Sequence, residues 1–239
     1  MKISVLIIAH NEEKYIKGCI ESILDQTKHP DEIVLLVHNS TDKTKEIAED
    51  FPITVAPFNG NEGIINARIE GLNHVSGDII LCIDGDSFAQ NNWVVVMSDT
   101  LKNNNNVLVG SWVKFKGAIF GLLYNFYSRY SYVSKKQTLA YWMWGSSLAF
   151  WGKDKKFVQE IIKNSVVFFK KLSVPSNLED YWLAMIMNKR GNIEVTNKTY
   201  ITTSTKKISS WKMILRAIRD RKSKYLMSDY FKSIKGKNL

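Results

Sequence analysis

The sequence is poor in the residues that cross-link chains or hold structural metals. Its 239 residues include two cysteines, Cys19 and Cys82, and four histidines, with no Cys-x-x-Cys pair and no zinc-ligand spacing. A disulfide framework and a structural zinc site are therefore not expected. Both cysteines lie within apolar segments, so we expect buried, reduced thiols.

Long apolar runs are also lacking. No uninterrupted apolar stretch reaches the roughly 18 residues that a membrane-spanning helix needs. The apolar run at residues 3–9 is too short for a signal peptide, and acidic residues follow it at once. These absences predict a cytoplasmic protein, with peripheral contact at the inner face of the membrane as the other expected location.

Two common nucleotide-binding fingerprints are missing. The first apolar run ends in Ala9-His10-Asn11-Glu12 without a Gly-x-Gly-x-x-Gly segment, and no Gly-Lys-Ser/Thr phosphate loop occurs in the chain. NAD binding in the Rossmann manner and P-loop chemistry are therefore disfavoured.

The C-terminal segment, residues 206–239, carries most of the net charge of +10. It holds eleven lysines and arginines but two acids, in a pattern that predicts a basic amphipathic helix or helix pair. Such a tail binds an anionic membrane surface, or it packs its apolar stripe on the domain and leaves its charges in solvent. No nucleic-acid-binding motif accompanies it, so no nucleic-acid partner is expected.

The sequence does contain an alternation of strand and helix patterns. Short apolar runs rich in β-branched residues predict strands, and apolar stripes at helical spacing predict helices between them. The predicted strands are residues 3–9, 33–37, 53–56, 78–83, 107–113, 141–151 and 195–203, and the predicted helices are 12–26, a short one from 40, 63–75, 91–102, 178–187 and 208–234. This alternation is typical of an α/β domain with a mostly parallel central sheet flanked by helices.

Polar segments follow three of the predicted strands. They are His10-Asn11-Glu12, His38-Asn39 and Asp84-Gly85-Asp86. Because ligands bind beyond the carboxyl ends of the strands in such sheets, we expect these segments to converge on one site.

Asp84-Gly85-Asp86 is the most specific of the three segments. Two carboxylates at a strand end destabilise each other unless a cation or hydrogen-bond donors compensate their charge. A divalent ion that bridges carboxylate and diphosphate oxygens suits such a pair. The competing interpretation is a surface turn, because Asp-Gly is favourable in turns.

The order of several short motifs resembles the nucleotide-binding half of family 2 glycosyltransferases, which are inverting enzymes with the GT-A fold. The matching segments are Asn11-Glu12-Glu13, Ser40-Thr41-Asp42-Lys43-Thr44, Asn61-Glu62-Gly63, Ala67-Arg68 with Gly71, Ser76-Gly77-Asp78, Asp84-Gly85-Asp86, Gly145-Ser146-Ser147, and Leu178-Glu179-Asp180-Tyr181-Trp182 with Gly191. The Gln-x-x-Arg-Trp signature of processive members is absent, which favours transfer of one sugar per acceptor.

The resemblance implies a metal-assisted reaction with Mn²⁺ or Mg²⁺. A sugar would pass with inversion from a nucleotide-sugar donor, UDP-linked by expectation, to a hydroxyl acceptor during polysaccharide, glycolipid or other glycoconjugate assembly. The implied metal ligands are Asp86 and Asp84; the nucleotide-sugar contacts are Ala9, Asn11, Glu12, His38, Asn39, Arg68, Asp84, Gly85 and Asp86; the acceptor contacts are Trp142, Trp144, Gly145 and Glu179; and the catalytic base is Asp180. Glycan or lipid-linked acceptors are the implied partners.

The resemblance also divides the chain. Residues 1–205 are expected to form one glycosyltransferase domain, with residues 1–106 as the nucleotide-sugar-binding half and 107–205 as the acceptor-binding half. The basic tail, 206–239, follows. Residues 112–151 hold 13 of the 28 aromatic residues; these side chains fill the core or contact an acceptor sugar or lipid.

One position departs from the family pattern. Family members usually carry an acid after the second strand, where it holds the nucleotide base, but this chain has His38 and Asn39 there. Either of the two takes over base recognition, or the loop is set differently. The sequence alone also leaves open a nucleotidyltransferase, and a non-catalytic protein that binds carbohydrate or an anionic surface on the same fold.

Overall fold

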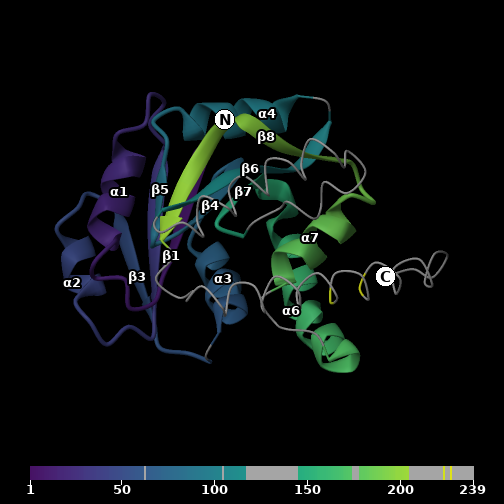
Figure 1. The fold of residues 1–239 in the computed structure, drawn as a ribbon, viewed down its shortest axis with the longest axis horizontal. Helices are drawn as coiled ribbons and strands as arrows, with labels where there is room; N and C mark the ends of the chain where they lie inside the picture. The colour runs from purple at the N-terminus through teal and green to yellow at the C-terminus, as the bar shows by residue number, and fades with distance from the viewer. Residues whose placement is uncertain are drawn as a thin grey trace.

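The computed structural model describes residues 1–61, 63–103, 105–116, 145–173 and 178–204, together with Ser223 and Met227. Its elements, drawn in Figure 1, are β1 (Ile3–Ala9), α1 (Ile16–Leu24), β2 (Glu32–His38), α2 (Thr44–Glu49), β3 (Thr54–Phe58), α3 (Ile64–Asn73), β4 (Ile79–Asp84), β5 (Ser87–Ala89), α4 (Trp93–Lys102), β6 (Asn106–Lys116), β7 (Ser147–Trp151), η2 (Gly152–Asp154), α6 (Lys155–Leu172), α7 (Glu179–Met187) and β8 (Asn192–Ser204).

The strands of these residues form one sheet in the order β3-β2-β1-β4-β7-β6-β8-β5. The first four run parallel, as the strand and helix alternation predicts. In the second half of the sheet, β7 is antiparallel to both β4 and β6, and β5 is antiparallel to β8. The α/β class and the helix-flanked sheet are confirmed, and the parallel part is concentrated in the N-terminal half.

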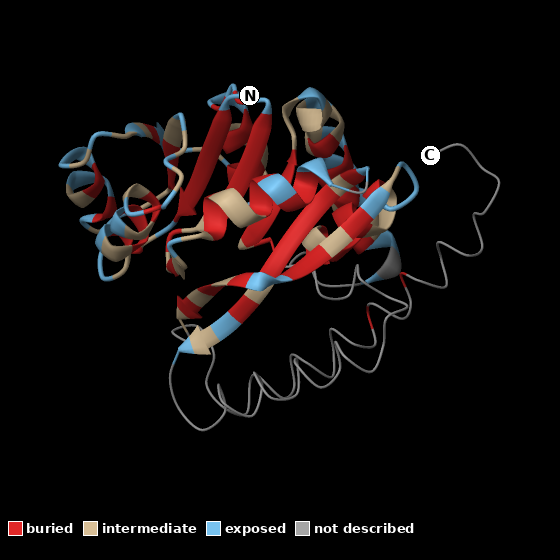
Figure 2. Ribbon diagram, turned by 90° about the horizontal axis from the view of Figure 1, so that it is seen from above, coloured by how far each residue is buried: buried red, intermediate tan, exposed pale blue. Residues whose placement is uncertain are grey.

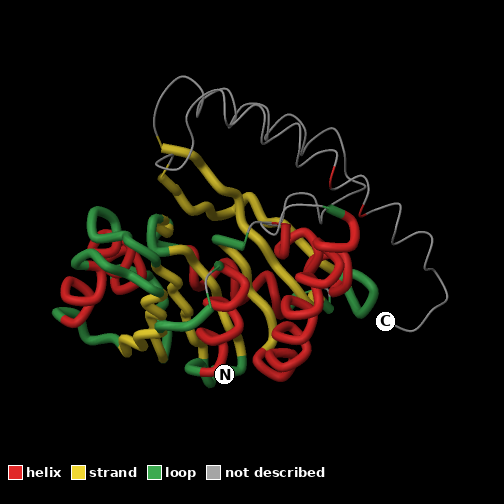
Figure 3. The backbone as a smooth tube through the Cα atoms, turned by 90° about the horizontal axis from the view of Figure 1, so that it is seen from below, coloured by secondary structure: helices red, strands yellow, loops and turns green. Residues whose placement is uncertain are grey.

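Alternate residues of the central strands face opposite layers of helices. On β1, Leu6 and Ile8 belong to the core cluster that includes residues of α3, α6 and α7. Val5 and Ile7 belong to the cluster that includes residues of α1 and α4. Figure 3 shows the strands lying between helices, and Figure 2 shows that the inner strands are buried. A strand covered on both faces explains why the sequence of residues 3–9 is almost entirely apolar.

Besides the single turn η2, two elements of the structure were not predicted. Helix α6 (Lys155–Leu172) has an apolar face in which Val158, Ile161, Ile162 and Phe169 are buried. This helical spacing of apolar residues is visible in the sequence, but it was not identified as a helix in the sequence analysis. Strand β5 has three residues, and among the described residues it pairs with β8, which is more than a hundred positions away in the sequence. A strand this short gives little sign of itself in the local residue pattern.

The two cysteines are as expected. Both are buried and form no disulfide. Burial, with carboxylates nearby, raises the pKa of the Cys19 thiol well above its ordinary value, and burial raises that of Cys82 to about 12. Thiols with such pKa values are protonated and inert near neutral pH.

Most of the tail predicted at residues 206–239 lies outside the described residues. The two tail residues that are described, Ser223 and Met227, are both buried, and Met227 belongs to the core cluster beneath α3, α6 and α7. Among the described residues, no helix has both the length and the apolar character needed to cross a bilayer.

At the end of the sheet where β1, β2 and β4 begin, Glu32 joins three segments of the chain. Its carboxylate accepts hydrogen bonds from the Ser4 hydroxyl, from the Ser76 amide at 2.8 Å and hydroxyl at 3.0 Å, and from Lys2 Nζ at 3.3 Å. Burial tends to raise the pKa of Glu32, but these donors outweigh it and lower the pKa to about 2.

Replacing Glu32 with Gln is expected to destabilise the fold by roughly 1.5–3 kcal/mol near neutral pH, because the charged acceptor is lost. The folded pKa of Glu32 lies below its ordinary value of 4.5. Its stabilisation is therefore complete above pH 4.5 and disappears as the pH falls toward about 2. Urea denaturation of wild type and Glu32→Gln across this range measures the difference. Glu21→Gln on the exposed side of α1 is the control, and a gap that does not change with pH would contradict the assignment.

Candidate functional site

The carboxyl ends of β1, β2 and β4 lie side by side, as the sequence predicted. Ile8 is paired with Asp84 across β1 and β4, and Ala9 is paired with Val37 across β1 and β2. The Gly85 amide donates to the Ile8 carbonyl at 2.8 Å. A Cβ on Gly85 would lie 2.8 Å from that of Ala9. The glycine between the two aspartates therefore allows β4 to turn directly against the end of β1.

The loops after β1 and β2 hold each other through side-chain to backbone hydrogen bonds. The Asn11 amide donates to Ser40 Oγ at 3.0 Å, and Asn11 Oδ1 accepts from the Thr41 amide at 2.8 Å. The Glu12 amide donates to Thr44 Oγ1 at 2.8 Å. Asn11 adopts a left-handed φ of 54°, which asparagine tolerates better than most residues. These contacts hold the segment Asn11-Glu12-Glu13 against the segment from Ser40 to Thr44.

The two residues that stand in the place of the usual acid, His38 and Asn39, have different surroundings. The His38 ring is buried, stacks on Phe58 with centroids 5.6 Å apart, and lies with Nε2 3.1 Å from the Asn61 carbonyl. Asn39 is half-buried, and its Nδ2 donates to the Gly60 carbonyl at 3.0 Å. Both side chains tie β2 to the loop after β3, and Asn39 is the more accessible of the two.

A buried guanidinium joins the Asp84-Gly85-Asp86 segment to the start of α7. Arg68 of α3 is 2% exposed, and its Nη2 lies 3.7 Å from Asp84 Oδ1 and 3.8 Å from Glu179 Oε1. Residues separated by about a hundred positions in the sequence therefore share one cation. No hydrogen bond from Arg68 Nε or Nη1, or to Glu179 Oε2, is formed within the described part of the chain.

Gly145 and Asp180 complete this cluster. The Gly145 amide donates to Asp180 Oδ2 at 3.0 Å. A Cβ at position 145 would lie 2.4 Å from Arg68 Nη1, which is closer than two such atoms approach. Gly145 thus leaves room for the guanidinium while its backbone orients the Asp180 carboxylate. In the sequence analysis, Gly145 was assigned to acceptor binding. In the structure Gly145 contacts Asp180 and lies against the Arg68 guanidinium.

The charges of this cluster shift the ionisation of its members. Burial, helped by the charge of Asp180, raises the pKa of Glu179 to about 7 against the opposing effect of Arg68. Burial tends to lower the pKa of Arg68, but the attraction of Glu179 and Asp84 outweighs it and raises that pKa. Arg68 therefore stays protonated and supplies the positive charge on which the surrounding acids depend.

The carboxylate of Asp86 has different partners. Ser204 Oγ donates to Asp86 Oδ2 at 2.8 Å, and Thr203 Oγ1 donates to Oδ1 at 3.3 Å. Neither Thr203 nor Ser204 was singled out from the sequence. They end β8, and no local motif marks them, so only the pairing of β8 with β5 reveals the contact.

The donor chemistry at the strand end suits a hard divalent cation. Asp84 and Asp86 offer carboxylate oxygens, and both side chains are partly exposed. No group of three or more His, Cys, Asp or Glu able to hold a metal occurs among the described residues. A pair of carboxylates is the protein part of a typical Mg²⁺ site, in which waters and substrate phosphates supply the other oxygens.

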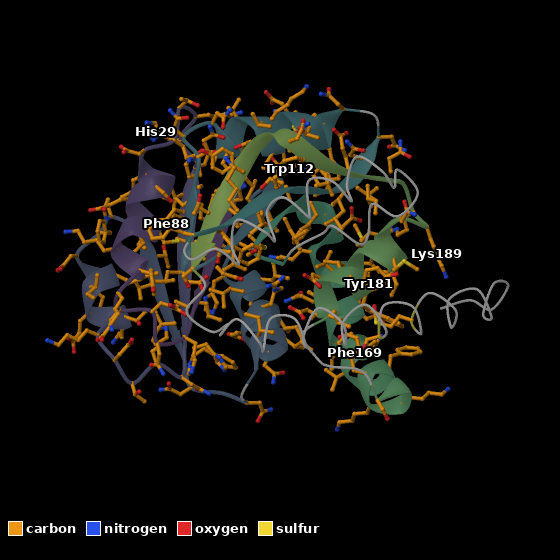
Figure 4. All side chains as sticks on the ribbon, viewed as in Figure 1. His29, Phe88, Trp112, Phe169, Tyr181 and Lys189 are labelled. Atoms are coloured by element: carbon orange, nitrogen blue, oxygen red, sulfur yellow. The ribbon has the colours of Figure 1, made fainter. Side chains whose placement is uncertain are left out.

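Two predicted acceptor residues, Trp142 and Trp144, lie outside the described residues, as does Glu62 of the third motif segment. The other predicted site residues are described. Ala9, Asn11, Glu12, His38 and Asn39 lie at the β1 and β2 ends. Arg68, Asp84, Gly145, Glu179 and Asp180 form the cluster around the guanidinium, while Gly85 packs against Ala9 and Asp86 contacts Thr203 and Ser204. In Figure 4, Tyr181, which follows Asp180 on α7, marks the acidic end of the site.

Comparison with known proteins identifies a family and a fold. The model of the family described as "Glycosyl transferase family 2" matches residues 4–162. The glucosyl-dolichyl phosphate glucuronosyltransferase of Haloferax volcanii is 29% identical over 132 residues, which cover 50% of this chain and 42% of that protein. Glycosyltransferase GlyA of Streptococcus pneumoniae is 29% identical over 48% of this chain and 17% of its own length. The chain thus matches less than half of either relative.

Solved structures share the fold at lower identity. Glucosyl-3-phosphoglycerate synthase from Mycobacterium tuberculosis, in complex with Mn²⁺, UDP and phosphoglyceric acid, has a TM-score of 0.57 and 21% identity, covering 82% of this chain and 68% of that one. The S. aureus protein TarS, in complex with UDP-GlcNAc, has a TM-score of 0.59 and 18% identity, covering 85% and 59%. These similarities support the GT-A architecture.

Removal of the buried guanidinium is expected to be costly. Arg68→Met leaves Glu179 and Asp84 without their cation and should destabilise the fold by about 3–5 kcal/mol. In a Glu179→Gln background the same substitution should cost less, because one buried charge is already gone. Urea denaturation of the four proteins of this cycle measures the coupling. Lys45→Met, which breaks the exposed pair with Glu49 at 3.4 Å, is the control and should cost about 0–1 kcal/mol. Equal costs at Arg68 in both backgrounds would contradict the shared-cation geometry.

Proposed function

Since the chain belongs to glycosyl transferase family 2, we propose that it transfers a sugar from a nucleotide-sugar donor to a hydroxyl acceptor, with inversion and with a divalent cation. The observation that carries this proposal is the Arg68 bridge, which joins Asp84 at the strand end to Glu179 at the start of α7, next to Asp180. A direct displacement at a sugar carbon requires a group that binds the departing diphosphate and a base for the acceptor hydroxyl, both held in the same site.

The donor end of the proposed site is built on Asp84 and Asp86. A bound Mn²⁺ or Mg²⁺ supplies charge compensation for the departing nucleoside diphosphate. Asp86 is proposed as the main ligand, because its carboxylate oxygens are held by neutral hydroxyl groups. Asp84 shares its charge with Arg68, and is proposed to contact the ribose and the cation's water shell.

The acceptor end is built on Asp180. In an inverting transfer the acceptor hydroxyl attacks the sugar carbon from the side opposite the diphosphate, and its proton passes to a base. Asp180 is half-buried, and the Gly145 amide fixes one of its oxygens. We propose that it takes this proton. Glu179, buried beside Arg68, shapes the local field rather than contacting the acceptor.

Recognition of the nucleotide base is proposed to rely on Asn39 rather than His38. The His38 ring is stacked on Phe58 and faces the Asn61 carbonyl, which leaves it a supporting role. The Nδ2 group of Asn39 donates to Gly60, so its oxygen is oriented as a hydrogen-bond acceptor. An acceptor suits the N–H group of a uracil ring, which is consistent with a UDP-linked donor.

The acceptor class and the location of the protein follow from the same proposal. A glycan or lipid-linked acceptor would place the reaction in polysaccharide, glycolipid or other glycoconjugate assembly, in the cytoplasm or at the inner membrane face. Contact of the basic tail with anionic lipid stays a prediction. Flotation with anionic vesicles tests it, and unchanged binding after removal of residues 206–239 would rule the tail out.

The family match favours this function over the two others left open by the sequence. A nucleotidyltransferase would use the same sheet edge for nucleotide binding, but the chain matches the glycosyl transferase family over residues 4–162. A non-catalytic binder would have no use for an Asp180 carboxylate held beside a buried cation.

Donor binding is expected to stabilise the protein. A nucleoside diphosphate or sugar nucleotide at 100 times its dissociation constant should add about 2.7 kcal/mol to the free energy of unfolding. The effect should be larger with Mn²⁺, and Asp86→Ala should remove the metal-dependent part. Thermal unfolding with a panel of UDP, GDP, ADP and their sugars measures both. If no member of the panel shifts the wild type, the transferase proposal fails.

Substitution of the proposed base should separate binding from transfer. Asp180→Asn keeps the side-chain shape and should bind the donor normally while transfer falls by about 10²–10⁴-fold. Release of nucleoside diphosphate, measured with glycan and lipid acceptor fractions, gives the rate, and NMR of the product anomer tests inversion. Asp99→Asn on the surface of α4 is the matched control. Normal turnover by Asp180→Asn would remove Asp180 as the base.

A further inference from the structure

Asp86 is held by the end of β8 at three points. The Ser204 amide donates to the Asp86 carbonyl at 3.2 Å, and the Ser204 hydroxyl donates to Oδ2 of the same residue at 2.8 Å. The Thr203 hydroxyl donates to Oδ1 at 3.3 Å. One strand end therefore fixes both the backbone and the carboxylate of Asp86.

The two aspartates of the segment are held in chemically different ways. Asp84 lies 3.7 Å from the Arg68 guanidinium, so part of its charge is already compensated by the protein. Among the ion pairs of the described residues, none includes Asp86, whose oxygens accept from hydroxyl groups instead. Neutral donors fix the direction of a carboxylate without cancelling its charge.

This arrangement suits a carboxylate that orients toward a cation. Each carboxylate oxygen has two lone-pair directions. Oδ2 of Asp86 accepts from Ser204 at 2.8 Å, whereas Oδ1 accepts from Thr203 at 3.3 Å and, at the long distance of 3.5 Å, from the Ser87 hydroxyl. The remaining lone pair of Oδ2 is able to coordinate a cation, while the hydroxyl donors limit rotation of the side chain. Partners of this kind set the geometry of metal ligands in other proteins, and their loss weakens metal binding.

The fold explains why β8 supplies these hydroxyls. Ser87, which directly follows Asp86 in the chain, is paired with Thr203 across β5 and β8. Lys116 at the end of β6 is paired with Ser204. In Figure 1, β8 runs from the end of α7 across the sheet to β5, and Figure 4 places Phe88 of β5 beside α1. The segment that follows the proposed base thus returns to the proposed metal ligand.

We propose that Thr203 and Ser204 are positioning residues that hold the Asp86 carboxylate in the orientation needed to bind a divalent cation. They touch neither the cation nor the sugar. The inference rests on the proposed function, in which Asp86 is the main metal ligand.

The experiment measures Mn²⁺ affinity directly. Electron paramagnetic resonance titration of free Mn²⁺ is performed on the full chain, alone and with UDP, for wild type, Thr203→Val, Ser204→Ala and the double variant. Thr203→Val preserves side-chain shape, and Ser204→Ala retains the backbone bond to Asp86. Each single variant is expected to weaken Mn²⁺ binding, and the double variant to weaken it by about 10–100-fold. Binding of UDP without metal should not change.

Two further variants make the outcome decisive. Thr202→Val changes the neighbouring threonine of β8, for which no bond to Asp86 is present in the described structure, and should bind Mn²⁺ like the wild type. Asp86→Asn should lose most Mn²⁺ binding. Thermal unfolding checks that the double variant is folded. If Asp86→Asn loses Mn²⁺ binding while the folded double variant keeps wild-type Mn²⁺ affinity, the positioning role is overturned and the proposed function stands. If the wild type binds no Mn²⁺ even with UDP, both fail.

Discussion

The burial of one positive charge organises the site. Arg68 is almost completely buried, and a lone guanidinium at that depth would be strongly destabilising without acids around it. Asp84 and Glu179 supply them, both near Nη2, and the absence of a side chain at Gly145 leaves the space that the guanidinium occupies. Three segments that are distant in the sequence are therefore locked together by one electrostatic requirement. The acids of α7 cannot move from the ends of the strands without leaving a buried charge uncompensated.

The same requirement separates the roles of the acidic residues. Asp84 and Glu179 both lie beside Arg68, so part of their charge is compensated by the protein itself. Asp86 accepts from hydroxyl groups, and Asp180 accepts from the backbone amides of Gly145 and Tyr181, so neutral donors orient both carboxylates. In the proposed reaction these two carry the chemistry, one at the diphosphate and one at the acceptor hydroxyl. The two aspartates, two residues apart, thus differ in what they contact: a guanidinium for Asp84 and hydroxyl groups for Asp86.

Much of this was readable from the chain. The apolar runs and helical stripes of the first hundred residues predicted the parallel half of the sheet, because strands buried on both faces must be apolar throughout. The order of the short motifs pointed to the family that the comparison then showed. The polar segments after β1, β2 and β4 were expected to converge, and the strand register brings them together. Helix α6 was also readable from its apolar spacing and was overlooked.

By itself, the sequence determined the α/β class, the family, and the identity of the acidic residues, because periodicity and short motifs are local properties of the chain. Only the tertiary structure decided which acid faces Arg68, that Gly145 contacts Asp180, and that Thr203 and Ser204 hold Asp86. Those contacts join residues up to 118 positions apart, as between Asp86 and Ser204. Pairing between distant segments depends on how the strands are ordered in the sheet, and no local pattern of residues records that order.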